Sequence, residues 1–185
     1  VPSRQNGHAA ILRAAHACGA ATTMGREETL HTLMAHPANP PSISNASSTG
    51  VILLTGFDPF GADTVNPSWL VAQALDGQRI AGHRVVAAQL STVFGKSLRQ
   101  LEALVATHRP ALVVCLGQAG GRNALSLERV GININDARIP DNAGQQPVDT
   151  PVVPGGPAAY FSSLPVKAML QGVRRAGVPC EVSQT

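Results

Sequence analysis

From residue 51 onward, short apolar runs alternate with segments of helical periodicity, and this alternation limits the chain to few folds. Four runs, each about as long as a typical strand and rich in apolar residues, predict β-strands. They are VILLTG (Val51–Gly56), RVVAAQL (Arg84–Leu90), ALVVCLG (Ala111–Gly117) and VPCEV (Val178–Val182). A further strand is predicted where apolar residues recur at Leu125, Leu127, Val130, Ile132 and Ile134.

Helices are predicted between these strands. Asn66 followed by Pro67 is typical of a helix start, because the amide can cap the first turn and proline fits the first helical position. This helix would run through PSWLVAQAL. A second helix over Phe94–His108 places Leu98, Leu101, Leu104 and Val105 on one face. The alternation predicts an α/β fold, a single three-layer α/β/α domain with a mainly parallel, twisted sheet.

Residues 1–50 lack this pattern and end in the run ANPPSISNASSTG. We therefore predict a disordered N-terminal extension before a domain over residues 51–185. Four of the six histidines lie in this extension, which suggests metal binding. However, His31 and His36 would point about 140° apart on a helix, and no spacing matches a ligand pattern, so we predict no metal site.

Charge and cysteine content exclude several functional classes. The net charge is only +3, aromatic residues make up 3% of the chain and no basic stripe exists, so nucleic-acid binding is not expected. The adjacent Arg174 and Arg175 are explained by a solvated helix end. Three cysteines without a C-x-x-C spacing indicate neither a disulfide framework nor a zinc site. With no apolar run long enough to span a membrane, we expect a cytoplasmic protein without a membrane partner.

The loop after the first predicted strand, GFDPFG, contains two of the four phenylalanines of the chain, Phe57 and Phe60. Ligands of α/β sheets bind beyond the carboxyl ends of the strands, and two aromatic rings there could hold a small neutral ring. Alternatively, both rings serve only to pack the edge of the sheet. The loop lacks G-x-G-x-x-G, so a dinucleotide site is not indicated.

Glu128 interrupts the apolar alternation of the predicted strand from Leu125 to Ile134. A carboxylate at the loop end of a strand can be solvated, or paired with Arg122 or Arg129. It can also take part in catalysis. The residues alone leave both interpretations open.

Taken in order, GFDPFG, NPSW, GQAGG, LSLERVGIN and DARIPDN resemble the pyroglutamyl peptidase type I family across residues 51–185. The resemblance implies that an N-terminal pyroglutamyl residue is removed from peptides by a Cys-His-Glu triad, with no metal or organic cofactor. It also implies assembly as a homo-oligomer, which is frequent in the family. The catalytic glutamate of the family falls on Glu128, which would orient the imidazole that accepts the thiol proton.

The resemblance extends to residues around the substrate. Phe57 and Phe60 would form walls of the pyroglutamate pocket, and the neighbouring positions fall on Asn66, Thr92 and Gln118. Arg138 falls close to the active site, where a cation could support the triad or the developing oxyanion. An ion pair of Arg138 with Asp136 or Asp141 is the alternative.

The nucleophile and the histidine of the family match no residue of this sequence. Cys115 and Cys180 lie in predicted strands and Cys18 in the extension, while His83 and His108 occupy other positions than the family's histidine. We therefore expect both groups beyond Thr185, the last part of the domain to be missing, apolar sheet surface to be exposed, and the chain to be inactive.

The alternative is a non-catalytic remnant of the same fold that binds pyroglutamate or peptides. The sequence also lacks a G-x-S-x-G elbow and a P-loop, which disfavours other α/β hydrolases and nucleotide-binding enzymes.

Overall fold

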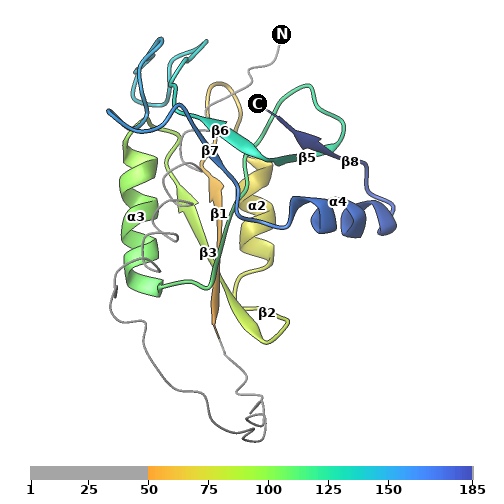
Figure 1. The fold of residues 1–185 in the computed structure, drawn as a ribbon. Coiled ribbons are helices and arrows are strands. Elements are labelled where there is room, and N and C mark those ends of the chain that lie inside the picture. Colours follow the sequence, from red (N-terminus) through yellow and green to blue (C-terminus); the bar gives the residue numbers. More distant parts are fainter. Residues whose placement is uncertain (1–49, 185) are drawn as a thin grey trace, which may run out of the picture.

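The computed structural model describes residues 50–184 (Figure 1). Residues 1–49 of the predicted extension, including its histidines, and Thr185 lie outside the described residues. The elements in chain order are β1 (Val51–Phe57), α2 (Pro67–Ala74), β2 (Arg79–Ile80), β3 (His83–Leu90), α3 (Lys96–His108), β4 (Leu112–Cys115), β5 (Leu125–Glu128), β6 (Val130–Ile132), β7 (Ala159–Phe161), α4 (Val166–Arg175) and β8 (Cys180–Ser183).

A four-stranded sheet with the order β2-β3-β1-β4 forms the centre of the molecule. β1 pairs in parallel with both β3 and β4, whereas the short β2 pairs antiparallel with β3 at one edge. The three long strands and the two helices between them lie where the sequence predicts them. The mainly parallel α/β architecture is thus confirmed.

The side chains of β1 alternate between two apolar clusters on opposite faces of this sheet. Leu53 packs in one cluster with Leu98 and Leu101 of α3, while Leu54 packs in the other with Ala72 of α2. Figure 1 shows α3 and α2 on either side of the strands. Leu53 and Leu101 are at most 1% exposed, and burial of each such side chain stabilises the fold by about 1.5–3 kcal/mol. This arrangement gives the three predicted layers.

The prediction of one strand from Leu125 to Ile134 is wrong. β5 pairs in parallel with β8, whereas β6 pairs antiparallel with β7, and the chain passes from one pairing to the other at Arg129. The apolar positions change parity between Leu127 and Val130, so a single regular strand would send the two halves of the pattern to opposite faces. The break keeps each half in a sheet of its own.

The sequence analysis predicts no range for the helix α4, but it does interpret Arg174 and Arg175 as a solvated helix end. Arg174 and Arg175 occupy the last turn of α4, as expected for a solvated helix end, where the helix dipole stabilises positive charges. The Arg174 Nε also donates a hydrogen bond of 2.9 Å to the carbonyl of Cys180 at the start of β8. No residue of α4 is fully buried. Within residues 50–184, every helix is too short or too polar to cross a membrane.

The carboxyl end of β1 lies directly against the first turn of α2. A Cβ atom on Gly56 would lie 2.5 Å from the carbonyl carbon and oxygen of Ser68 and from the amide nitrogen of Trp69. The Phe57 amide donates to the Ser68 hydroxyl at 3.0 Å. Because the opposing atoms are backbone, only glycine allows this approach.

We predict that Gly56→Ala destabilises the domain by about 1–3 kcal/mol, because the added methyl group forces the strand and the helix apart. The matched control is Gly172→Ala in α4, where an added Cβ meets nothing within 4 Å. The control should be neutral or stabilising by up to about 1 kcal/mol. Urea unfolding monitored by circular dichroism measures both variants, and equal midpoints would contradict the steric explanation.

Candidate active site

Asp58 holds the loop after β1 in place through both its backbone and its side chain. Its amide donates to the Leu90 carbonyl at 2.9 Å, which continues the pairing of β1 with β3. Its carbonyl accepts hydrogen bonds from the Asn66 Nδ2 at 3.0 Å and the Thr92 hydroxyl at 3.1 Å. Its carboxylate accepts from the Thr92 amide at 2.6 Å. The loop that carries Phe60 is therefore braced by two of the predicted pocket residues.

The two phenylalanines of this loop have different environments. Phe57 is 4% exposed and belongs to the apolar cluster on the α3 face, together with Leu53 and Leu90. Phe60 is half-buried within the loop. Packing thus accounts for Phe57, and of the two rings only Phe60 keeps a partly open surface. A role of either ring as a wall of the substrate pocket stays a prediction.

Asn66 caps α2, as the sequence predicts. It is 3% exposed, and its Oδ1 accepts hydrogen bonds from the Ser68 amide at 3.1 Å and the Ser68 hydroxyl at 2.7 Å. Thr92 is likewise 3% exposed. Both side chains position the loop after β1, and direct contact of either with a substrate stays a prediction.

Gln118 lies in the loop after β4 and faces the same region. Its Nε2 donates to the Asp63 carboxylate at 3.2 Å, which links the loop after β4 to the loop after β1. Its Oε1 is buried and accepts no hydrogen bond from the residues that the structure describes. A buried acceptor without a donor is costly, so this oxygen is suited to an N–H group of a ligand.

Glu128 ends β5 and forms an ion pair with Arg122. The Arg122 Nη1 and the Glu128 Oε1 are 3.1 Å apart, and each side chain is 18% exposed. Glu128 also lines an apolar groove between β4 and β5. The surface-pair interpretation is therefore correct in part, but the pair is more sheltered than an ordinary surface pair.

The motif DARIPDN lies in a long excursion between β6 and β7, in which Arg138 is exposed. Asp141 is 8% exposed, and its carboxylate accepts hydrogen bonds of 2.8 Å from the amides of Phe94, Ala143 and Gln145. The role of Arg138 stays a prediction.

The next residue, Asn142, reaches the loop after β1. Its amide donates to the Thr92 carbonyl at 3.1 Å, and its Nδ2 donates to the Pro59 carbonyl at 2.8 Å. Sequence reasoning assigned no role to Asp58 or Asn142, although both lie in motifs that it singled out.

The two thiols in the described part of the chain lie in β4 and β8, and its two imidazoles lie apart from these loops. Burial raises the pKa of the Cys115 thiol, an effect that the neighbouring Thr55 hydroxyl offsets only in part. Cys180 is 5% exposed. His83 begins β3 and His108 ends α3, so both lie at the amino ends of the parallel strands. Within residues 50–184, no group of three or more His, Cys, Asp or Glu side chains could hold a metal ion.

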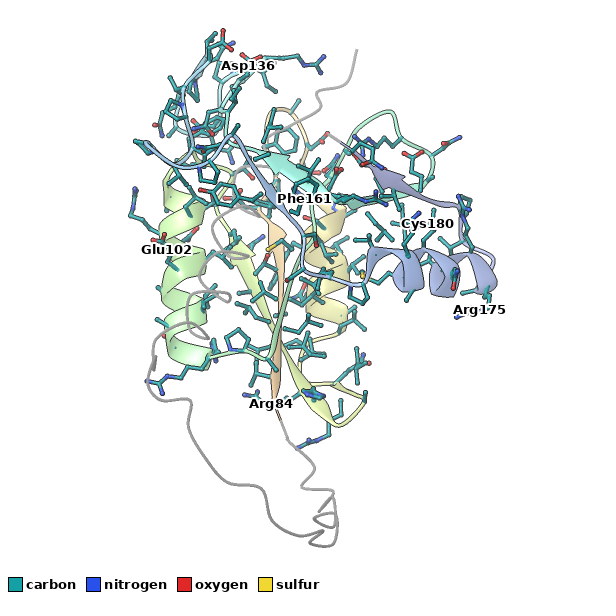
Figure 2. All side chains as sticks on the ribbon, viewed as in Figure 1. Arg84, Glu102, Asp136, Phe161, Arg175 and Cys180 are labelled. Carbon is teal, nitrogen blue, oxygen red and sulfur yellow. The ribbon has the colours of Figure 1, made fainter. Side chains whose placement is uncertain are left out.

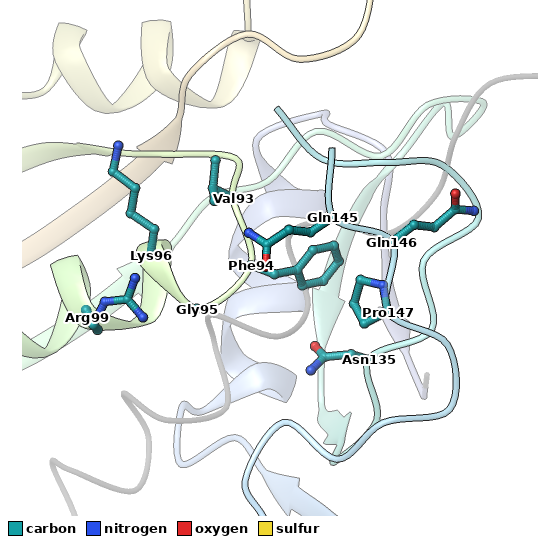
Figure 3. A pocket seen from close by; sticks show the side chains of 9 residues that line it. All are labelled: Val93, Phe94, Gly95, Lys96, Arg99, Asn135, Gln145, Gln146 and Pro147. Atoms are coloured by element: carbon teal, nitrogen blue, oxygen red, sulfur yellow. The ribbon is translucent and has the colours of Figure 1, made fainter. Parts of the chain in front are cut away.

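A separate hollow of about 610 Å³ lies at the start of α3 (Figure 3). Its lining includes Phe94, Gln145 and Pro147, and Lys96 extends away from them. None of the predicted site residues lines this hollow, so we assign it no part in the site.

Comparison with known proteins agrees with the motifs and the fold. Residues 50–185 match the family model described as pyroglutamyl peptidase. The chain belongs to the pyroglutamyl peptidase family. It is 59% identical over 134 residues to a pyrrolidone-carboxylate peptidase of Klebsiella pneumoniae (strain 342), and the match covers 72% of this chain and 63% of the relative. It is 58% identical over 134 residues to pyrrolidone-carboxylate peptidase 1 of Ralstonia nicotianae, covering 72% of this chain and 62% of the relative.

Solved structures of the family have the same fold. Pyroglutamyl peptidase I of Bacillus amyloliquefaciens superposes with a TM-score of 0.72 at 48% identity, covering 74% of this chain and 66% of that chain. A mutant pyrrolidone carboxyl peptidase of Pyrococcus furiosus gives 0.71 at 41% identity, covering 73% of this chain and 65% of that chain. The chain thus spans somewhat less than two thirds of the length of these relatives, and the α/β fold class is confirmed.

We predict that Asn66→Ala destabilises the domain by about 2–3 kcal/mol, because it removes a helix cap and leaves the carbonyl of the half-buried Asp58 without one of its donors. Asn66→Ser keeps a capping oxygen but is too short to reach Asp58, so it should cost about 1 kcal/mol less. Denaturant unfolding measures both changes. An Asn66→Ala variant as stable as the parent chain would show that the loop does not depend on this side chain.

Proposed function

We propose that this chain supplies the substrate-holding residues and the orienting carboxylate of a cysteine peptidase that removes N-terminal pyroglutamate from peptides. The observation that carries the proposal is the buried Gln118 Oε1, which accepts no hydrogen bond in the described part of the chain. A pyroglutamyl ring is a neutral lactam with one N–H donor, and this donor would satisfy the oxygen. The half-buried Phe60 would supply an apolar surface for the ring.

The reaction would follow the general course of thiol acyl transfer. A thiolate attacks the carbonyl carbon that links pyroglutamate to the next residue, an imidazolium protonates the departing amine, and a pyroglutamyl thioester remains. Water then hydrolyses the thioester and regenerates the thiol. Neither a metal nor an organic cofactor is needed for these steps.

Glu128 would orient the imidazole in this scheme. A carboxylate that accepts the N–H of one ring nitrogen leaves the other nitrogen free to take the thiol proton, and it stabilises the imidazolium that forms. The ion pair with Arg122 and the 18% exposure of both side chains support this role, because they hold an ionised carboxylate in one place.

The thiols and imidazoles within residues 50–184 are unsuited to complete such a triad. Cys115 packs against the apolar cluster on the α3 face, and its raised pKa disfavours the thiolate at neutral pH. His83 and His108 belong to the end of the sheet opposite the loop after β1, since that loop follows the carboxyl end of a parallel strand. We therefore propose that the 185-residue chain by itself does not turn over pyroglutamyl substrates.

The purified 185-residue chain should release no fluorophore from a pyroglutamyl aminomethylcoumarin amide above the rate without protein. The background release that occurs without protein should be unchanged by iodoacetamide, because it does not depend on a thiolate. The full-length Klebsiella pneumoniae relative serves as the positive control. Turnover by the 185-residue chain that iodoacetamide abolishes would refute the proposal of inactivity.

Binding without turnover is the second candidate function, and the bracing of the loop after β1 by Asn66, Thr92 and Asn142 favours it. Calorimetric titration should detect pyroglutamate binding that Gln118→Leu weakens about tenfold or more, as expected for the loss of one buried hydrogen bond. Gln73→Leu, at an exposed position on α2 outside the site, should leave the affinity within twofold. Equal affinities for both variants would exclude Gln118 as the lactam acceptor.

We propose homo-oligomers as the working assembly, in line with the family resemblance. We also propose a cytoplasmic location without nucleic-acid or membrane partners.

A further inference from the structure

The hydrogen bond between Gln118 and Asp63 has a fixed direction, which follows from the chemistry of the two groups. An ionised carboxylate has only acceptor oxygens, whereas a glutamine amide presents a donor NH2 group on one side and an acceptor oxygen on the other. The Gln118 Nε2 lies 3.2 Å from the Asp63 Oδ2. The reversed amide would bring two acceptor oxygens together, so the Gln118 Oε1 is directed away from Asp63.

The backbone places Asp63 for this contact. A turn joins Asp63 to Phe60, whose carbonyl accepts a hydrogen bond of 3.3 Å from the Asp63 amide. Gly61 within this turn has a φ of 64°, a conformation that favours glycine. Because β1 and β4 run parallel, the loops that carry Asp63 and Gln118 leave the sheet at the same end. Figure 2 shows both loops there, with Arg84 near the start of β3 labelled at the opposite end.

The two partners of this hydrogen bond differ in burial. Asp63 is exposed, so its carboxylate exchanges water for the Gln118 amide with little gain in stability. The Gln118 Oε1 is buried and accepts no hydrogen bond from the described residues, which is costly. An exposed contact that directs a buried acceptor toward no protein donor is better explained by a ligand that brings a donor than by stability of the fold.

We propose that Asp63 is a specificity-determining positioning residue, which holds the Gln118 amide with its oxygen toward the ligand and thereby selects a ring N–H group. Its carboxylate excludes the reversed amide, in which the Gln118 Nε2 would face the ligand and favour a ring acceptor. The site thus discriminates between a lactam and a lactone of the same shape, in which a ring oxygen replaces the N–H. This inference deepens the proposed function and rests on the assignment of Gln118 as the acceptor of the lactam N–H.

Calorimetric titration of the 185-residue chain with two ligands, the amide of pyroglutamic acid and the same amide with a lactone ring, measures this selection. The readout is the ratio of the two dissociation constants, and the parent chain should bind the lactam about tenfold or more tightly than the lactone. Asp63→Lys replaces an acceptor with a group that only donates, which favours the reversed Gln118 amide. This variant should lower the preference for the lactam at least about fivefold.

Two further variants separate this selection from general effects of charge or folding. Asp63→Glu keeps a carboxylate that only accepts, so it should leave the ratio within about twofold of the parent value. Asp63→Asn can accept or donate, so it should give an intermediate ratio. Both ligands are neutral and have the same shape, so a change of net charge or of stability alters both affinities alike and leaves the ratio unchanged.

The orientation of the Gln118 amide is measured separately, without ligand, by nuclear Overhauser contacts between its Nε2 protons and the β protons of residue 63. The contact should be present in the parent chain. It should weaken in Asp63→Asn, which has the same β protons but tolerates the reversed amide.

The inference alone is overturned if the parent chain binds both ligands equally, if Asp63→Lys lowers the ratio by less than about fivefold, or if Asp63→Glu lowers it as much as Asp63→Lys. A missing Overhauser contact in the parent chain overturns it as well. Binding of neither amide, with the contact present, overturns the proposed function at Gln118 and with it the selection of a ring N–H.

Discussion

The close approach of β1 to the first turn of α2 is the contact on which the candidate site depends. Gly56 has no side chain, so the two backbones can approach closely. The Ser68 hydroxyl accepts a hydrogen bond from the Phe57 amide and donates one to the Asn66 Oδ1. This contact joins the motifs GFDPFG and NPSW. The first supplies Gly56, which leaves room for the helix, and the second supplies the first turn of α2, which packs against it. The direction in which the chain leaves β1, and hence the position of Phe60, is fixed at this point.

The bracing then spreads from the loop after β1 to distant parts of the chain. Asp58 is bonded to Thr92, and Asn142 is bonded to both Thr92 and Pro59. Asp141 in turn fixes the start of α3 through the Phe94 amide. Three loops that follow different strands therefore form one hydrogen-bonded unit at the carboxyl end of the sheet. Because their polar groups bond one another, these loops are held in fixed relative positions.

The sequence predicts the strands β1, β3 and β4 and the helices α2 and α3, because each has a complete local signal. Asn66 and Pro67 mark the start of α2, and the apolar face of α3 repeats at helical spacing. The change of parity between Leu127 and Val130 is the local signal for the break at Arg129. It is easily missed, because apolar residues recur on both sides and suggest one continuous strand.

The bracing by Asp58 and Asp141 was not predictable from local pattern. Their partners lie 34 and 47 residues away in the sequence, and an aspartate in a Pro-containing loop has many possible roles. For Glu128 and Phe57 the residues left a choice between packing or pairing and catalysis. The structure shows a core position for Phe57 and an ion pair for Glu128, beside a groove that reaches the carboxylate.

The separation of β4 from β5 has a consequence for contacts with other chains. These strands are close in sequence, and consecutive strands usually become neighbours, but here residues 116–124 connect them without pairing. In the described part of the chain, each of these two strands therefore keeps one edge without a partner strand. Such open edges offer templates for pairing with other chains, which raises the tendency to aggregate.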